Sequence, residues 1–206
     1  MNDPLFSIPL LILSSYLIGS FPTAYLYCRL RGKDIRKEGS GNVGATNAAR
    51  LFGKSAFIIV FGIDALKGYV SVRYLVPLFV HSNVPADWLL LLVLLFAVIG
   101  HVWTVFLGFK GGKGVAVSAG GLVALMPFSV LFSLIVFGLV FIFSRIVSLG
   151  SVCAALALPL IAWTTKEPGL YTAFSVILSA FILFTHRSNL HRLFAGTEKK
   201  VGRTGQ

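Results

Sequence analysis

The chain has 206 residues, of which 56% are hydrophobic and only 12% are charged, against about 25% charged in an ordinary soluble domain. This composition excludes a soluble globular protein, a disordered segment and a disulfide scaffold. The formal net charge of +11 comes from cations that lie as islands between long apolar runs, which is typical of an integral membrane protein with basic cytoplasmic loops and not of a nucleic-acid-binding protein.

Long apolar stretches predict transmembrane helices, because a membrane-crossing helix needs about 20 mainly apolar residues. In chain order these stretches cover residues 5–27, 56–77, 88–106, 115–143, 147–163 and 170–184. No basic segment precedes the first stretch, so we expect it to be a membrane helix and not a cleaved signal.

The stretch 115–143 is too long for one ordinary crossing, since its 29 residues would form a helix of roughly 43 Å. It also contains Gly120-Gly121 and then Pro127, which weaken a helix. We therefore expect a turn near Met126-Pro127 and two short crossings. A re-entrant hairpin is the alternative.

The distribution of charge favours seven crossings with the N-terminus outside. In that arrangement most lysines and arginines lie on the cytoplasmic side, whereas a single crossing over 115–143 would export Arg145 and the basic tail against the positive-inside rule. The sequence thus predicts an all-α integral membrane protein of about seven transmembrane helices with a cytoplasmic C-terminus. We expect residues 1–206 to form a single multi-pass membrane domain, whose segment 186–206 is basic and cytoplasmic.

Three polar segments fall on the predicted cytoplasmic side, and the first spans residues 39–50. Its three glycines allow successive amide groups to face one concavity that binds an anion. Thr46 or Asn47 would cap a following short helix, and the Arg50 guanidinium offers a two-pronged contact for phosphate. The alternative is a loop without a special role.

The second polar segment, residues 100–114, ends in Gly-Gly-Lys-Gly (111–114) at the exit of an apolar helix. We expect main-chain amide groups of this loop and the ammonium group of Lys113 to face an oxyanion. The loop is not a Walker A motif, because Lys113 is followed by Gly114 and not by Ser or Thr. The alternative is a basic helix end whose lysines extend to the membrane interface, and His101 is expected to be a packing residue.

The third polar segment covers residues 186–198. If the last apolar helix continues through it, His186, Asn189 and Arg192 share one face, where a histidine beside an amide can orient a hydroxyl or accept its proton. The alternative is a basic helix in contact with anionic lipid. Ser148 and Ser151, near Arg145 at a cytoplasmic helix end, would add polar contacts for a substrate.

Acidic residues are scarce in the whole chain, which has seven Asp and Glu against 18 Lys and Arg. Asp64 and Lys67 lie three residues apart within an apolar stretch, where ionisable residues are candidates for function, although a pair that only fixes helix packing is an equally good interpretation. The predicted cytoplasmic face has only Asp34, Glu38 and Glu198 as acids. No acidic cluster suits Mg²⁺ and no Cys/His spacing suits Zn²⁺, so we expect neither a metal nor another cofactor.

The three segments together resemble the bacterial acyl-phosphate-dependent glycerol-3-phosphate acyltransferases. The resemblance rests on Gly-Ser-Gly-Asn-x-Gly-Ala-Thr-Asn (39–47), Gly-His…Phe-Lys-Gly-Gly-Lys-Gly (100–114) and His-Arg-x-Asn…Arg-Leu…Gly-x-Glu (186–198), and it covers essentially the full length. It implies transfer of a fatty acyl group from acyl phosphate to the 1-hydroxyl of sn-glycerol 3-phosphate, giving lysophosphatidic acid. The enzyme would lie in the bacterial cytoplasmic membrane, in contact with membrane lipid, with its active site facing the cytoplasm.

The resemblance also implies roles for residues. The catalytic residues would be Ser40, Asn42, Lys113 and His186, and the substrate-binding residues would be Gly41, Arg50, Gly111, Gly112, Ser151 and Asn189. The proton acceptor is either His186 or a substrate phosphate, whose second pKa lies near 6. The alternative function is a membrane transporter of organic phosphates, although the sequence lacks the internal repeat of many transporters.

Overall fold

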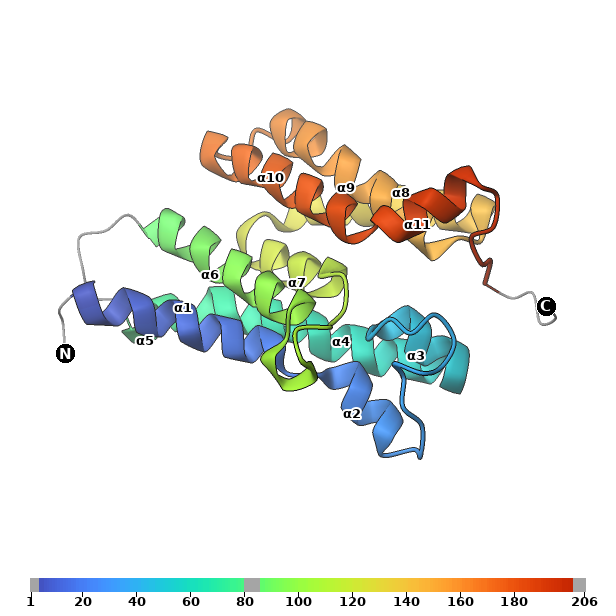
Figure 1. Ribbon diagram of the computed structural model, residues 1–206. Coiled ribbons are helices and arrows are strands. Elements are labelled where there is room, and N and C mark those ends of the chain that lie inside the picture. Colours follow the sequence, from blue (N-terminus) through green and yellow to red (C-terminus); the bar gives the residue numbers. More distant parts are fainter. Residues whose placement is uncertain (1–3, 80–85, 202–206) are drawn as a thin grey trace. The chain divides into compact units, whose positions relative to one another are not determined.

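The computed structural model describes residues 4–79 and 86–201, and every regular element among them is a helix (Figure 1). In chain order the elements are α1 (Pro4–Ser20), α2 (Thr23–Arg29), α3 (Ala45–Phe52), α4 (Lys54–Val70), a π-helical turn (Ser71–Leu75), α5 (Val76–Phe79), α6 (Ala86–Val102), a 3₁₀ turn (Val105–Leu107), α7 (Val115–Leu125), α8 (Pro127–Ser144), α9 (Val147–Thr164), α10 (Gly169–Thr185) and α11 (Arg187–Phe194). His81, for which the sequence predicts no role, and the last residues of the basic segment 186–206 lie outside the described residues.

Five helical stretches of the described chain are long and apolar enough to cross a membrane. They are Ser7–Arg29, Lys54–Phe79, Ala86–Leu107, Pro127–Ser144 and Val147–Thr164. The pair α10 and α11, which is bent by 65°, is a sixth candidate, and α7 is a shorter apolar helix. This agrees with the predicted class of all-α membrane protein, whereas the count of seven crossings is not confirmed.

The predicted break inside the stretch 115–143 is confirmed. Helix α7 ends at Leu125, Met126 has a non-helical backbone (φ −142°, ψ 70°), and Pro127 is the first residue of α8. Proline suits this position because its missing N–H would have no partner in the first helical turn.

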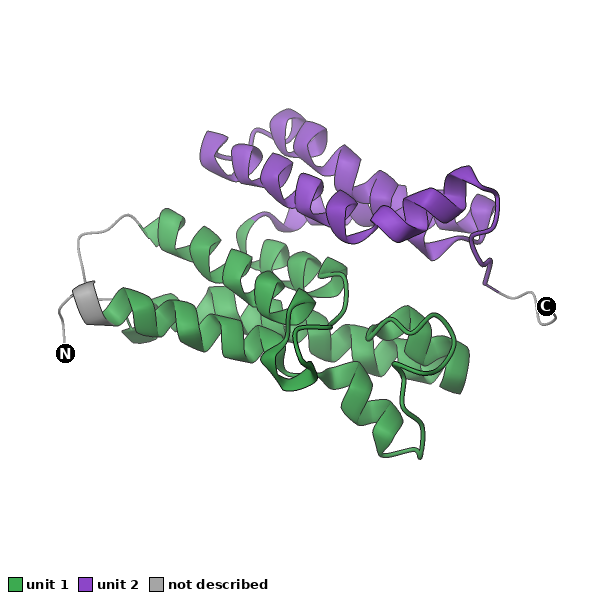
Figure 2. Ribbon diagram, viewed as in Figure 1, with its two compact units in different colours: residues 1–125 green, residues 126–206 purple. Residues whose placement is uncertain are grey.

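The chain divides into two compact units, residues 1–125 and 126–206 (Figure 2), and the single domain predicted over 1–206 stays a prediction. In the first unit α1 packs against α6, and α4 packs against α7. Small residues let these backbones approach each other, since a Cβ on Gly100 would overlap the carbonyl of Tyr16 and a Cβ on Gly68 would overlap that of Val117. Such contacts are typical of helices that pack within a membrane.

In the second unit α9 packs against both α8 and α10. Gly150 of α9 lies against the Phe137 ring of α8, and the Ser179 hydroxyl of α10 donates to the Ala155 carbonyl of α9. Outward-facing side chains of α8 such as Ile142 and Phe143 are exposed and apolar, as a helix surface in contact with lipid requires.

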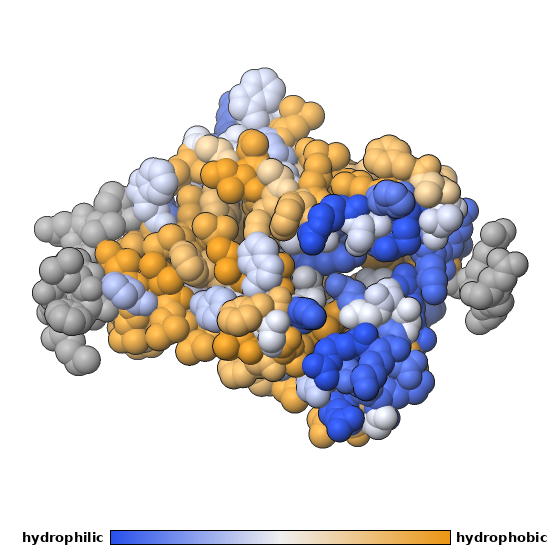
Figure 3. Space-filling model, viewed as in Figure 1, coloured by the Kyte–Doolittle hydropathy of each residue, from blue (hydrophilic) through white to orange (hydrophobic). Residues whose placement is uncertain are grey.

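The surface of each unit is hydrophobic along the long helices and hydrophilic at particular segments (Figure 3). In the first unit the hydrophilic surface covers α2 and the loop that follows it, while α1 presents mainly hydrophobic surface. In the second unit the hydrophilic surface covers α11. These hydrophilic segments include the first and third polar motifs.

Candidate active site

Asn47 organises the first glycine-rich motif from within α3. Its side chain is 1% exposed, its Oδ1 accepts the Ser40 N–H at 2.9 Å, and its Nδ2 donates to the carbonyls of Ile35 (3.2 Å) and Glu38 (3.0 Å). The expectation that Thr46 or Asn47 caps the helix is wrong, because α3 begins at Ala45 with Gly44 as its N-cap. A side chain in the first turn points back toward the preceding loop, so Asn47 supports that loop instead.

The loop itself needs glycine. Gly39 and Gly41 have φ values of +62° and +70°, a left-handed conformation that side chains disfavour. Ser40 is exposed and Asn42 is half-buried, so both side chains are accessible to a ligand. Arg50 lies on the exposed side of the last turn of α3.

A charged turn precedes this loop. Arg36 Nη2 lies 2.8 Å from Asp34 Oδ2, and hydrogen bonds from the Arg36 side chain and backbone lower the pKa of the Asp34 carboxyl to about 2. Because Arg36 balances the negative charge of Asp34, the other lysines and arginines of this segment leave the loop with a net positive charge.

The second glycine-rich motif folds back on the end of α6. The Gly111 N–H donates to the Val102 carbonyl at 2.9 Å, and the Gly112 N–H donates to the His101 carbonyl at 3.1 Å. The expectation that these two amide groups face an oxyanion is therefore not met, because the last carbonyls of α6 need donors and take them. Lys113 follows directly, is half-buried, and lies two residues before the first residue of α7.

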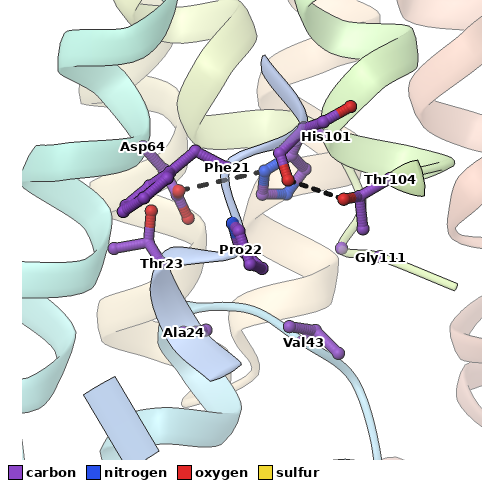
Figure 4. A pocket seen from close by; sticks show the side chains of 11 residues that line it. Phe21, Pro22, Thr23, Ala24, Val43, Asp64, His101, Thr104 and Gly111 are labelled. Carbon is purple, nitrogen blue, oxygen red and sulfur yellow. Dashed lines mark hydrogen bonds and ion pairs between the residues drawn. The ribbon is translucent and has the colours of Figure 1, made fainter. Parts of the chain in front are cut away.

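The first two motifs meet in the first unit at a small pocket (Figure 4). Val43 of the first motif and Gly111 and Gly112 of the second line it. The other lining residues are Ser20, Phe21, Pro22, Thr23, Ala24, Asp64, His101 and Thr104. A Cβ on Gly112 would lie 2.8 Å from the Val43 carbonyl oxygen, so a larger residue would force the two motifs apart.

The third motif lies in the second unit and contains a sharp bend. The condition of one continuous helix through this motif is not met, because α10 ends at Thr185, α11 begins at Arg187, and the two are bent by 65°. His186 lies at the bend, is 3% exposed, and has its Nδ1 2.8 Å from the Ile182 carbonyl oxygen.

Glu198 connects three residues of the second unit. Its Oε1 accepts from Asn189 Nδ2 at 2.6 Å and from the Ser148 hydroxyl at 2.8 Å, and its Oε2 accepts from Arg192 Nε at 2.6 Å. Burial raises the pKa of this carboxyl, but the hydrogen bonds from Asn189, Ser148 and Arg192 outweigh burial, so its pKa is lower than usual. Sequence analysis placed Glu198 at the end of the third motif and among the few acids but gave it no role, so this pairing was missed.

Ser151 lies one turn from Ser148 on α9. Its hydroxyl donates to the Val147 carbonyl at 3.0 Å, and the residue is 7% exposed.

Within residues 4–79 and 86–201, no group of three or more His, Cys, Asp or Glu side chains could hold a metal ion.

Comparison with known proteins decides the family. The family model described as glycerol-3-phosphate acyltransferase matches residues 9–196. The chain belongs to this family. The glycerol-3-phosphate acyltransferase 2 of Moorella thermoacetica is 42% identical over 194 residues, which cover 94% of this chain and 97% of that protein. The glycerol-3-phosphate acyltransferase of Thermosynechococcus vestitus is 44% identical over 201 residues, with 94% of each chain covered.

This acyltransferase is also similar to solved structures of PlsY (YgiH), an integral membrane glycerol 3-phosphate acyltransferase. The glycerol 3-phosphate form gives a TM-score of 0.86 at 37% identity and covers 95% of this chain and 96% of that chain. The lysophosphatidic acid form gives a TM-score of 0.84 at the same identity and coverage. These findings confirm the family inferred from the three motifs and the fold of an integral membrane enzyme.

Proposed function

We propose that this acyltransferase moves a fatty acyl group from acyl phosphate to the 1-hydroxyl of sn-glycerol 3-phosphate. The hydroxyl oxygen attacks the acyl carbonyl carbon, the bond between that carbon and the phosphate oxygen breaks, and the hydroxyl proton passes to a base. The products are lysophosphatidic acid and inorganic phosphate, and no cofactor takes part. Family membership supports the reaction. The location of the active site is supported by the contact between Val43 of the first motif and Gly112 of the second, next to Lys113.

Lys113 and Arg50 bind phosphate groups in this proposal. Lys113 lies just before the N-terminus of α7, where the helix dipole and unpaired amide groups favour an anion. Arg50 adds a guanidinium that can form two parallel hydrogen bonds with phosphate. Two cations near two phosphorylated substrates account for the scarcity of acids in these segments.

Ser40 and Asn42 contact the acyl-phosphate group, and Gly41 with Gly111 and Gly112 shapes the backbone around it. Negative charge develops on the carbonyl oxygen during attack, and the loss of one donor to such an oxyanion costs about 10²–10³ in rate. Lys113 and the exposed polar side chains of the first motif supply that stabilisation.

Glycerol 3-phosphate is held by Ser151, His186 and Asn189. The Ile182 carbonyl can only accept, so the short contact with His186 Nδ1 assigns the donor proton to Nδ1, and Nε2 is then the ring nitrogen left to accept a proton. That tautomer suits a base that accepts the hydroxyl proton. A substrate phosphate is the competing base.

The pH dependence of turnover separates the two bases. We expect His186→Asn and His186→Ala to lose nearly all activity, with the acid limb of the pH–rate profile removed, if the imidazole is the base. Substantial turnover in either variant with an unchanged acid limb assigns the proton to the substrate phosphate.

Purified protein with acyl phosphate and glycerol 3-phosphate, without vesicles, tests the reaction itself. Formation of lysophosphatidic acid with release of phosphate supports the enzyme, and its loss in Lys113→Ala and Arg50→Ala supports the site. Lys54→Ala is the matched control, because Lys54 is an exposed cation at the start of α4. No reaction together with flux of glycerol 3-phosphate into proteoliposomes would instead support an organic-phosphate transporter.

The proposed topology has seven crossings in the bacterial cytoplasmic membrane, with the N-terminus outside and the site facing the cytoplasm. The charge distribution supports it, because Lys110 and Lys199 then lie inside. In a variant without Cys28 and Cys153, the substitutions Lys110→Cys and Lys199→Cys are expected to resist a membrane-impermeant thiol reagent in intact spheroplasts, whereas Lys166→Cys is labelled. Labelling of Lys199→Cys from outside would overturn this topology.

A further inference from the structure

A buried cluster of ionisable residues lies in the first unit at the pocket of Figure 4. Asp64 and Lys67 of α4 form an ion pair, with 2.7 Å between Oδ1 and Nζ and side chains only 3% and 7% exposed. His101, near the end of α6, is 9% exposed, and its Nδ1 lies 3.9 Å from the same Oδ1. The reaction proposed above uses none of these three residues.

Lys67 connects α4 to the end of α1. Its Nζ donates to the Phe21 carbonyl at 2.7 Å and to the Gly19 carbonyl at 3.3 Å. These carbonyls lie where α1 ends and before α2 begins at Thr23, so they lack partners within a helix. The Phe21 carbonyl also accepts the Thr23 N–H at 3.0 Å, and one ammonium group bonds both carbonyls and so fixes the chain segment that lines one side of the pocket.

His101 lies against the turn of the second motif. The turn is built on the last carbonyls of α6, since Gly111 and Gly112 donate to Val102 and His101. A Cβ on Gly112 would overlap Nε2 of the His101 ring, so the ring and the glycine backbone are in close contact. In Figure 4 the ring lies between Asp64 and the Gly111 segment.

Packing alone does not require these charges. The contact of α4 with α7 depends on small residues, because a Cβ on Gly68 would overlap Val117 and a Cβ on Gly120 would overlap Ala65. Burial of two charges costs free energy, and a buried ion pair is often no more stable than an apolar pair of the same size. Ionisable residues inside a membrane helix are therefore candidates for a functional role.

We propose that Asp64, Lys67 and His101 are positioning residues that hold the Gly111–Gly112 turn, and hence Lys113, in the conformation that binds substrate phosphate. Lys67 fixes the α1–α2 segment and pairs with Asp64, the Asp64 carboxylate lies beside the His101 ring, and the ring supports the turn. The inference rests on the phosphate-binding role given above to Lys113. It predicts an effect through binding of acyl phosphate, not a loss of the fold.

Hydrogen–deuterium exchange of the segment 108–114 in detergent tests the positioning directly. The variants are His101→Ala and the double variant Asp64→Asn/Lys67→Gln, which leaves no unpaired buried charge and so should fold. We expect exchange in 108–114 to become about tenfold faster as the turn opens locally, while exchange in α8 and α9 is unchanged. Unchanged exchange in 108–114 in both variants would overturn the proposal.

Kinetics supply the second measurement. We expect kcat/KM for acyl phosphate to fall on the order of 10- to 100-fold, through a higher KM because a displaced Lys113 binds phosphate less well, and through a lower kcat because Lys113 also stabilises the oxyanion. A fall in kcat with the KM unchanged would contradict a positioning role. If the wild-type protein forms no lysophosphatidic acid, the proposed function fails, but the exchange comparison still tests the cluster.

Ser71→Ala is the matched control. Ser71 directly follows α4, is fully buried, and has a hydroxyl with no hydrogen-bond partner within the described part of the chain. Its removal changes a buried polar group in the same helical span, and its hydroxyl forms no hydrogen bond with the second motif. Equal effects of Ser71→Ala and His101→Ala on exchange in 108–114 and on the KM would overturn the inference.

Discussion

Arg192 Nε lies 2.6 Å from Glu198 Oε2, across the end of α11. The glutamate side chain is 5% exposed, whereas that of Arg192 is 40% exposed. Because the other carboxylate oxygen accepts from Asn189 and Ser148, the chain after α11 is connected to both α11 and α9. This carboxylate therefore holds Asn189 of the third motif in one orientation.

Glu198→Gln is expected to lower the free energy of unfolding by about 1–2 kcal/mol. A hydrogen bond to a charged group contributes about 1.5–3 kcal/mol, and the exposed Arg192 recovers part of this through water. Thermal unfolding in detergent measures the change. Glu38→Gln is the control, because Glu38 is an exposed acid in the first unit, and equal shifts in the two variants would contradict the role of Glu198.

The same network predicts a pH dependence of stability. The pKa of Glu198 is lower in the folded protein than in the unfolded chain, so its contribution is fully present above the unfolded value of about 4.3 and is lost as the pH falls through the folded value. We expect the midpoint of thermal unfolding to fall with pH below that range more steeply in the wild type than in Glu198→Gln. Parallel pH profiles of the two proteins would show that another acid is responsible.

Hydropathy and helix-breaking residues were sufficient to predict the membrane class and the break before Pro127, because both depend on local sequence. The break follows from the chemistry of proline, whichever helices pack nearby. The bend at His186 could not be predicted in the same way, since no glycine or proline marks it. It became visible only in the structure, where Asn189 and Arg192 meet Glu198.

Glycine patterns predicted the positions of the two loops but not the direction of their amide groups. Gly111 and Gly112 donate to the end of α6, and only the path of the folded chain determines which carbonyls come within reach. The role of Asn47 was missed for the same reason, since its partners lie 7 to 12 residues earlier in the chain. The glycine spacing could have indicated that a buried amide holds the loop.

Removal of the Asn47 side chain is expected to loosen the first motif. Asn47→Ala leaves the Ser40 N–H and the carbonyls of Ile35 and Glu38 without their partner, so we expect a loss of about 1–3 kcal/mol in unfolding free energy. We also expect a higher KM for acyl phosphate, because Ser40 and Asn42 lose their support. Thermal unfolding and initial rates measure the two effects.

Thr46→Ala is the control for that experiment. Thr46 lies in the same turn of α3 and is half-buried, and its hydroxyl does not cap the helix. Its removal should leave the KM near the wild-type value. If Thr46→Ala raised the KM as much as Asn47→Ala, the loop would depend on the helix turn in general and not on the amide.

Two glycines separate backbone strain from contact with Asn47. Gly39 and Gly32 have φ values of +62° and +80°, so alanine at either position costs about 1–2 kcal/mol of conformational strain. A Cβ on Gly39 would also overlap Asn47 Oδ1, whereas a Cβ on Gly32 meets nothing within 4 Å. We therefore expect Gly39→Ala to raise the KM for acyl phosphate strongly and Gly32→Ala to change stability alone, as initial rates and thermal unfolding would measure. Similar kinetics in the two variants would mean that the Asn47 contact does not shape the phosphate-binding loop.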